Sequence, residues 1–187
     1  LWGGFAMAEA KTEYLSDLAG ERIYYHTQGW GDLGIDTSVK PTDGRAAMPL
    51  QILDKNYAKG LGHHAPGEIV VDLNGEFDGF EAEVGIQMQN NPVGTVVFQV
   101  YVDDNLVFES GVMRETDAAR PVSVPVTGAN TLRLVVTDAG DGIICDCADW
   151  ADARLTRSAT GASAPARDPM DVAPFARVAS WEPSRMD

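Results

Sequence analysis

The sequence is short of positive charge, and it has no long apolar run. Its 187 residues include 14 lysines and arginines against 28 aspartates and glutamates, which gives a formal net charge of −14. Nucleic acids and anionic membrane surfaces are bound by basic faces, so this charge argues against both as partners. No stretch of about 18 apolar residues occurs, so the sequence predicts no membrane insertion. A neutral or cationic ligand is compatible with the charge.

Cysteine is also scarce, with only Cys145 and Cys147 in the chain. A disulfide between residues two apart would close a small and strained ring, so we expect no structural bridge. The two thiols could be imagined as a zinc site together with His63 and His64, but their spacing matches no standard zinc pattern. We expect the Cys145 thiol to pack as a small apolar group.

Motifs of catalysis are missing as well. The sequence has no G-x-S-x-G motif of a serine hydrolase, and nothing in it pairs two carboxylates as a glycosidase requires. We therefore expect no catalytic activity within these residues and no required cofactor, so that any activity would lie in a linked domain.

What the sequence does contain is period-two alternation of apolar and polar residues, which is typical of half-buried strands. Gly, Asn, Asp and Pro turns separate these segments, and residues 103–105 (Asp-Asp-Asn) are typical of a tight hairpin. No segment carries a helical stripe longer than a turn or two, and strands do not alternate with helices. The sequence thus predicts an all-β antiparallel β-sandwich or barrel. The predicted strands are 68–73, 77–88, 95–103, 105–110, 121–126 and 131–138.

The two ends of the chain differ in composition from this middle part. Residues 1–8 (LWGGFAMA) form an apolar run that closes on an A-x-A pattern, which is typical of the end of a secretory signal peptide. We interpret them as a remnant of such a peptide and predict a secreted, periplasmic or extracellular protein. Residues 158–187 are rich in Ala, Pro and Ser, and we interpret them as a linker or docking tail towards a further domain.

Four segments together resemble one known family. They contain YLSDL, GWG and IDTS (14–38), LQILDKNYAKGLGHHAPGEIVVDL (50–73), the strands of 80–113, and LRLVVTDAGDGIICDCADWADARL (132–155). The KGLG-x-HA pattern and the D-x-G-D-G and D-x-ADWADA patterns are long and specific. On these patterns the chain resembles the NPCBM/NEW2 domain, which is carbohydrate-binding module family 51.

The resemblance implies a galactose-binding-domain-like β-sandwich of the jelly-roll type over residues 9–157. It also implies a non-catalytic module of a secreted multidomain protein. Such a module would bind galactose-type or related glycans and target a linked glycoside hydrolase to them. The alternative hypothesis is a structural or interaction module of an exported protein that binds no sugar.

One position departs from the family pattern. His64 occupies the family's usual histidine in KGLG-x-HA, whereas Cys147 stands where the family usually carries histidine, in DHADW. If that second histidine shapes the ligand site, the replacement would change the sugar specificity or remove sugar binding.

Sugars are neutral polyols with apolar faces, and proteins bind them with an aromatic platform and polar side chains. Trp30, between two glycines in a predicted loop, is the candidate platform, and the alternative is that it folds inward and fills one end of the sandwich. His64, Asp146 and Asp149 complete the predicted ligand set, the two aspartates because the family motif includes them. Trp150 is expected to be buried.

Asp138 and Asp141 belong to the same acidic stretch. Their Asp-rich loop favours turn chemistry, in which the side chains accept hydrogen bonds from local backbone groups. The alternative interpretation is a calcium site, because a hard cation prefers several carboxylate and carbonyl oxygens.

Overall fold

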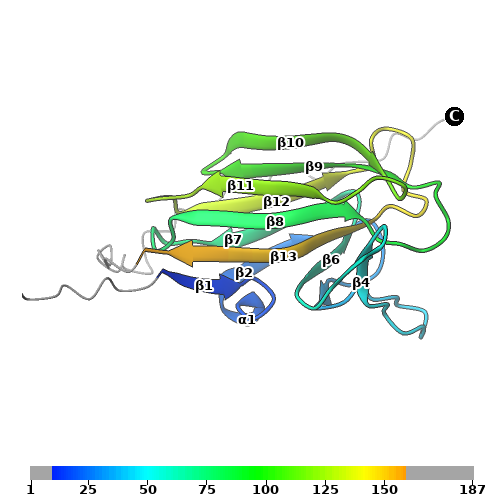
Figure 1. The fold of residues 1–187 in the computed structure, drawn as a ribbon, viewed down its shortest axis with the longest axis horizontal. Helices are drawn as coiled ribbons and strands as arrows, with labels where there is room; N and C mark the ends of the chain where they lie inside the picture. Colours follow the sequence, from blue (N-terminus) through cyan, green and yellow to red (C-terminus); the bar gives the residue numbers. More distant parts are fainter. Residues whose placement is uncertain (1–9, 159–187) are drawn as a thin grey trace, which may run out of the picture.

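The computed structural model describes residues 10–158. Two antiparallel sheets face each other as a β-sandwich (Figure 1). The first sheet has the order β11 (Arg120–Pro125), β8 (Gly79–Ile86), β13 (Cys147–Arg157), β6 (Gly60–His64), β3 (Gly34–Ile35), with β1 (Lys11–Tyr14) paired to β13. The second has the order β10 (Asn105–Arg114), β9 (Thr95–Val102), β12 (Thr131–Thr137), β7 (Gly67–Asp72), β2 (Ile23–Thr27).

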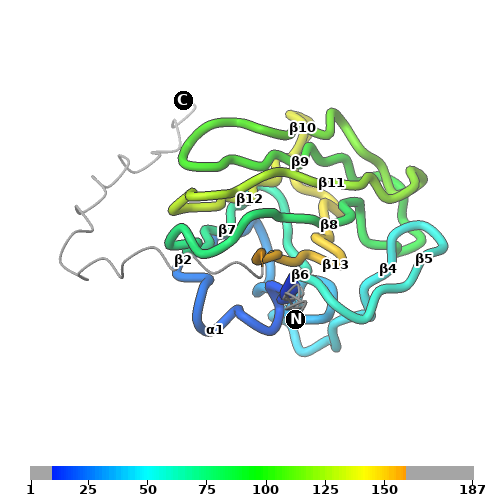
Figure 2. The backbone as a smooth tube through the Cα atoms, turned by 60° about the vertical axis from the view of Figure 1, so that its left-hand side comes forward, coloured from blue at the N-terminus to red at the C-terminus, as the bar shows by residue number. Residues whose placement is uncertain are grey.

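Two small elements complete the described part of the chain. A hairpin of β4 (Leu50–Ile52) and β5 (Lys55–Tyr57) lies to one side of the first sheet (Figure 2). The single helical turn α1 (Ala19–Arg22) precedes β2. No helix among residues 10–158 is long and apolar enough to cross a membrane. The predicted signal-peptide remnant (1–8) and all but the first residue of the predicted tail (158–187) lie outside the described residues.

The predicted all-β antiparallel sandwich is confirmed, and the six strands predicted from alternation correspond to β7 to β12. Alternate residues of these strands point inward and form one apolar core between the sheets. Trp150 is fully buried there, as predicted, and its ring packs edge-on against Phe98 with 5.1 Å between the ring centroids. The alternation in the sequence therefore reflects the burial of one face of these strands.

The predicted hairpin is also confirmed. Asp103 and Asp104 connect β9 to β10 with φ angles of +44° and +66°, the pattern of a two-residue type I′ turn. Asp103 Oδ1 accepts hydrogen bonds from the backbone N–H groups of Asn130 and Thr131, at 2.9 Å each. The turn is thereby tied to the start of β12.

Part of the outer face of the first sheet is shielded from solvent. The covering segment, residues 36–57, runs from the end of β3 through β5 and lies over it. Leu50, Ile52 and Tyr57 pack against Ala151 of β13 as a second, small apolar cluster. Gly62 of β6 allows the same segment to approach, since a Cβ atom there would lie 2.1 Å from the Ser38 carbonyl carbon. This cover forms one wall of the cavity described below.

Candidate functional site

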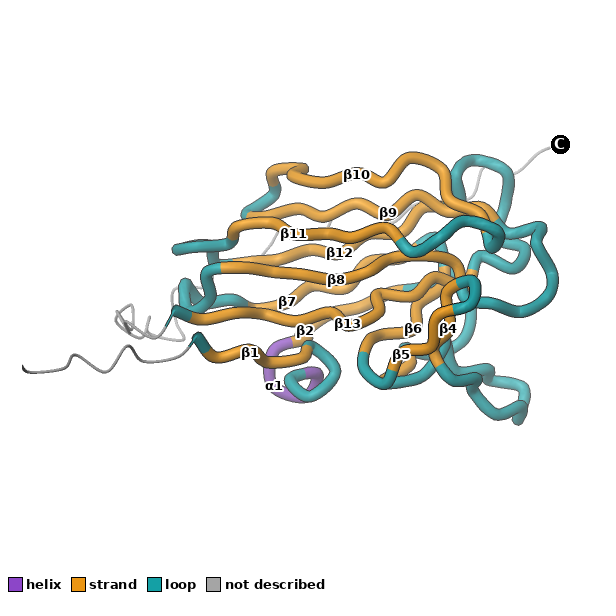
Figure 3. Tube along the Cα trace, viewed as in Figure 1, coloured by secondary structure: helices purple, strands orange, loops and turns teal. Residues whose placement is uncertain are grey.

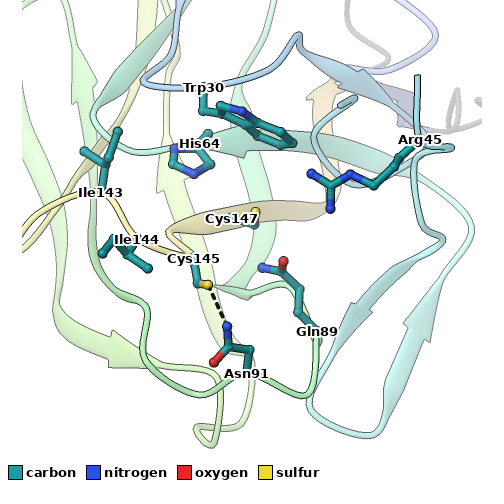
Figure 4. Close-up of a pocket in the computed structure, with 9 residues that line it drawn as sticks. All are labelled: Trp30, Arg45, His64, Gln89, Asn91, Ile143, Ile144, Cys145 and Cys147. Atoms are coloured by element: carbon teal, nitrogen blue, oxygen red, sulfur yellow. Dashed lines mark hydrogen bonds between the residues drawn. The ribbon is translucent and has the colours of Figure 1, made fainter. Parts of the chain in front are cut away.

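Long loops gather at one end of the sandwich (Figure 3). A cavity of about 380 Å³ opens among them and is shown in Figure 4. It is bounded by loops from both sheets and by the ends of β6 and β13. Its lining residues are Trp30, Arg45, His64, Gln89, Asn91, Ile143, Ile144, Cys145 and Cys147. A second cavity of about 190 Å³ adjoins it and shares Trp30, Arg45, Gln89 and Cys147.

Trp30 forms one wall of both cavities. It is half-buried and lies outside the apolar core between the sheets. Its glycine neighbours hold the loop close to the sheet: Gly31 has a φ of +72°, and a Cβ atom on Gly29 would lie 2.3 Å from the Ala65 carbonyl oxygen. The structure thus places this tryptophan at the cavity and not as a plug of the sandwich interior.

His64 lies against Trp30, with 5.8 Å between the ring centroids. Its Nδ1 is 2.6 Å from the carbonyl oxygen of Ala65, which can only accept, so Nδ1 carries the proton and donates. Burial lowers the pKa of His64, so the ring is neutral at neutral pH. In that tautomer Nε2 is a hydrogen-bond acceptor available to a ligand.

Both cysteines line the larger cavity. Cys147 is directly opposite His64 in the pairing of β13 with β6, and burial raises the pKa of its thiol to about 12. It is therefore protonated at neutral pH. Cys145 does not pack as a purely apolar group as predicted: it is half-buried, and its Sγ accepts a hydrogen bond from Asn91 Nδ2 at 3.1 Å. Both cysteines are free.

Asp146 is fully buried and does not line either cavity. Its Oδ1 accepts a hydrogen bond from the backbone N–H of Thr95 at 3.0 Å. Burial raises the pKa of Asp146 to about 6, with a smaller contribution in the same direction from the nearby charges of Asp141 and Asp138. Its geometry is that of a group that holds the loop before β13, and its role in ligand binding stays a prediction.

Asp149 is also fully buried and away from the cavity lining. It lies on β13 between Gly62 of β6 and Gly85 of β8, beneath the segment that covers this face. Burial raises the pKa of Asp149 well above its ordinary value, against the opposing effect of the Gln51 backbone amide. The structure therefore brings Trp30 and His64 together, but it does not bring the two predicted aspartates to the same surface.

Asp138 makes the local backbone contact that the turn interpretation predicts, whereas Asp141 bonds to a distant side chain. Asp138 Oδ1 accepts from the backbone N–H of Gly140 at 3.1 Å, and the Asp141 carboxylate accepts from the Thr95 hydroxyl at 2.7 and 2.8 Å. Among residues 10–158, no group of three or more His, Cys, Asp or Glu side chains is arranged to hold a metal ion.

Sequence reasoning missed five lining residues: Arg45, Gln89, Asn91, Ile143 and Ile144. Four of them had a feature in the sequence that could have identified them. Gln89 and Asn91 belong to an amide-rich turn, and Ile143 and Ile144 are apolar residues in a loop, where they remain exposed. The position of Arg45 has no sequence signal, because the fold alone brings the loop between β3 and β4 to Trp30.

The sequence profile of the NPCBM/NEW2 domain matches residues 11–156. The chain belongs to this family. The match covers both sheets and every lining residue of the larger cavity.

Relatives place NPCBM/NEW2 modules beside enzymes of glycan breakdown. A Renibacterium salmoninarum protein assigned as an endo-alpha-N-acetylgalactosaminidase is 32% identical over 149 residues, which are 80% of this chain and 10% of that protein. This module thus spans about a tenth of the length of that curated relative.

Solved structures of the family share the fold. The CBM51 of a Clostridium perfringens GH95 protein, solved with methyl-galactose, is 35% identical with a TM-score of 0.65, and the match covers 78% of this chain and 99% of that one. A structure with CBM51-2, GlcNAc and INT domains of Clostridium perfringens ZmpB is 33% identical with a TM-score of 0.71, covering 79% of this chain and 32% of that one.

Proposed function

We propose that the chain is a non-catalytic carbohydrate-binding module that binds a galactose-type or related sugar in the cavity between Trp30 and Cys147. In the whole protein it would hold a linked glycoside hydrolase near its glycan, outside the cell. The observation that carries the proposal is the pairing of the half-buried Trp30 ring with a neutral His64 on one wall of the cavity.

This pairing suits a sugar for two reasons. The Trp30 indole offers an apolar surface for the C–H face of a pyranose, and His64 Nε2 can accept a hydrogen bond from a hydroxyl group. The side-chain amides of Gln89 and Asn91 add further polar groups to the opposite side of the cavity. A ligand with one apolar face and several hydroxyls can satisfy all of these groups at once.

The same lining supports a role without catalysis. Hydrolysis of a glycosidic bond uses two carboxyl groups on either side of the bond. Neither cavity has an aspartate or glutamate among its lining residues. The relatives' enzymatic names and solved ligands support a module that acts through targeting, in which linkage raises the effective concentration of substrate.

The expected affinity for one sugar is low. A shallow site that contacts a single ring buries few atoms, so Kd should lie on the order of a millimolar to tens of micromolar. The test is a glycan array followed by titration calorimetry with methyl galactoside, on the wild type and on Trp30→Ala. Trp30→Ala should abolish measurable binding while leaving the circular dichroism spectrum unchanged.

The matched control is Tyr25→Ala, which removes an exposed aromatic side chain from β2, outside both cavities. It should bind as the wild type does. If the folded wild type bound no glycan, the structural or interaction module would be the better hypothesis, and the Cys147 replacement would be its physical reason. Turnover of a chromogenic galactoside by this chain alone would contradict the non-catalytic role. Loss of binding in EDTA would add calcium at Asp138 and Asp141.

A further inference from the structure

The larger cavity has an unusual charge for this chain. Acidic residues outnumber basic ones by 28 to 14. Yet Arg45 is the one side chain with a formal charge among the residues that line the two cavities. His64 is neutral, and Asp146 and Asp149 are buried away from the lining, so the Arg45 guanidinium is the one charged group in the lining. Its ion-pair partner Asp43 is not part of that lining.

Arg45 is placed to contact a ligand. Its guanidinium carbon is 5.7 Å from the centre of the Trp30 ring, and the side chain points towards the cavity between Trp30 and Gln89 (Figure 4). The side-chain amide nitrogen of Gln89 is buried and has no protein partner. Two donors therefore lie on either side of the space in front of Trp30.

The present partner of Arg45 does not lock it in place. Asp43, two residues earlier, accepts from Arg45 Nε at 2.9 and 3.0 Å and lies 2.7 Å from Nη2. The side chain of Arg45 is 69% exposed and that of Asp43 is 50% exposed. Exposed ion pairs of this kind add little stability, so the guanidinium can exchange this carboxylate for an anionic group on a ligand.

We propose that the sugar recognised by this site carries an anionic substituent, a sulfate ester or a carboxylate, and that Arg45 binds it. The inference rests on the proposed sugar-binding function and specifies its ligand class. The guanidinium presents a planar fork that matches the oxygens of either group, whereas a neutral hydroxyl uses only one of its donors. A sugar whose ring stacks on Trp30 would place a substituent at its edge within reach of Arg45.

The experiment is calorimetry on the whole chain with three probes: methyl galactoside, galactose 6-sulfate and methyl galacturonide. The charged probes should bind roughly three- to tenfold more tightly than the neutral one, a charge-assisted hydrogen bond reduced by solvent exposure. The two charged probes separate the sulfate from the carboxylate source, and a preference for either one supports the proposal.

Three variants assign the preference to Arg45. Arg45→Gln should lose the preference for the charged probes, whatever its own affinity for methyl galactoside. Arg133→Gln makes the same charge change on β12, outside both cavities, and should keep the preference. Asp43→Asn releases Arg45 from its partner and should increase the preference, which gives a second test that does not depend on the folding of Arg45→Gln.

The outcomes distinguish this inference from the proposed function. Equal affinities for neutral and charged probes, or a preference that survives Arg45→Gln, would overturn the role of Arg45 while leaving galactoside binding intact. Absence of binding to all three probes by the folded wild type would overturn both.

Discussion

Acidification should destabilise this protein through His63. The side chain is fully buried on the core side of β6, and its Nε2 donates to the Thr27 carbonyl oxygen at 2.7 Å. Its Nδ1 is buried without a partner. Protonation would place an unpaired N–H and a positive charge in the core, so burial lowers the pKa of His63 from its ordinary 6.5 to about 4.

The size of the effect follows from the two pKa values. Between pH 6.5 and about 4 the unfolded chain binds a proton at this position and the folded chain does not, so stability falls as the pH falls. The contribution of neutral His63 is fully present above the unfolded value. About 2 kcal/mol of unfolding free energy should be lost by about pH 5, and roughly 3 kcal/mol once the folded histidine is also protonated.

Two buried carboxyl groups act in the opposite direction. Burial raises the pKa of Asp146 to about 6 and that of Asp149 well above its ordinary value, so both stabilise the fold as the pH falls. The histidine effect must therefore be isolated by comparison with His63→Gln, which can still donate to Thr27 but does not titrate. Urea unfolding of both proteins should be measured at about pH 7.5 and pH 5.

The quantity that decides is the difference between the two proteins. Between about pH 7.5 and pH 5 the unfolding free energy of the wild type should fall by about 2 kcal/mol more than that of His63→Gln, whatever the stability of the variant at neutral pH. Parallel pH dependences would refute the reasoning, because they would mean that His63 titrates alike in the folded and unfolded chains.

Three further predictions concern the cavity and its cover. Galactoside affinity should be constant down to about pH 6.5 and fall only at lower pH, where protonation of His64 removes its hydrogen-bond acceptor. Calorimetry at several pH values checks this. A fall in affinity that begins above about pH 6.5 would contradict the neutral tautomer. Gly62→Ala should destabilise the fold by about 3 kcal/mol or more because its Cβ would meet the Ser38 backbone, whereas Gly20→Ala, with open space around it, should be neutral or stabilising in thermal unfolding. Cys147→His should tighten galactoside binding about three- to tenfold by adding a polar group opposite His64, with Cys147→Ser as the control. An unchanged Kd would show that the cysteine at this position does not limit affinity.

Alternation predicted strands such as β9 and β12 because each of them is covered on one face only. Their polar residues alternate with core residues, so the period is visible in the sequence. Strand β6 shows no such period, since all five of its residues are buried. One face packs into the core and the other lies beneath the covering segment, and a strand covered on both faces loses its alternation.

Two residues of the candidate site, Trp30 and His64, could be predicted from their sequence context. A tryptophan between glycines and a histidine in a long family motif are both recognisable, and both line the cavity. Arg45 was not recognisable, because its role depends on a loop that the fold brings beside Trp30. Asp149 was assigned from the motif to the ligand surface, but the covering segment buries it. A sequence motif names a residue but does not show whether its side chain faces the ligand or the covering segment.

The aspartates that precede β13 show how acidic residues can shape a cavity without lining it. Asp141 and Asp146 both bind Thr95, one through its hydroxyl and the other through its backbone N–H. These bonds tie the loop before β13 to the start of β9, and the same loop carries Ile144 and Cys145 to the edge of the cavity. A ligand would therefore meet aliphatic and thiol groups there, while the carboxylates hold the loop from behind. The concentration of negative charge in this stretch follows from the construction of the loop, and it need not mark the surface that touches the sugar.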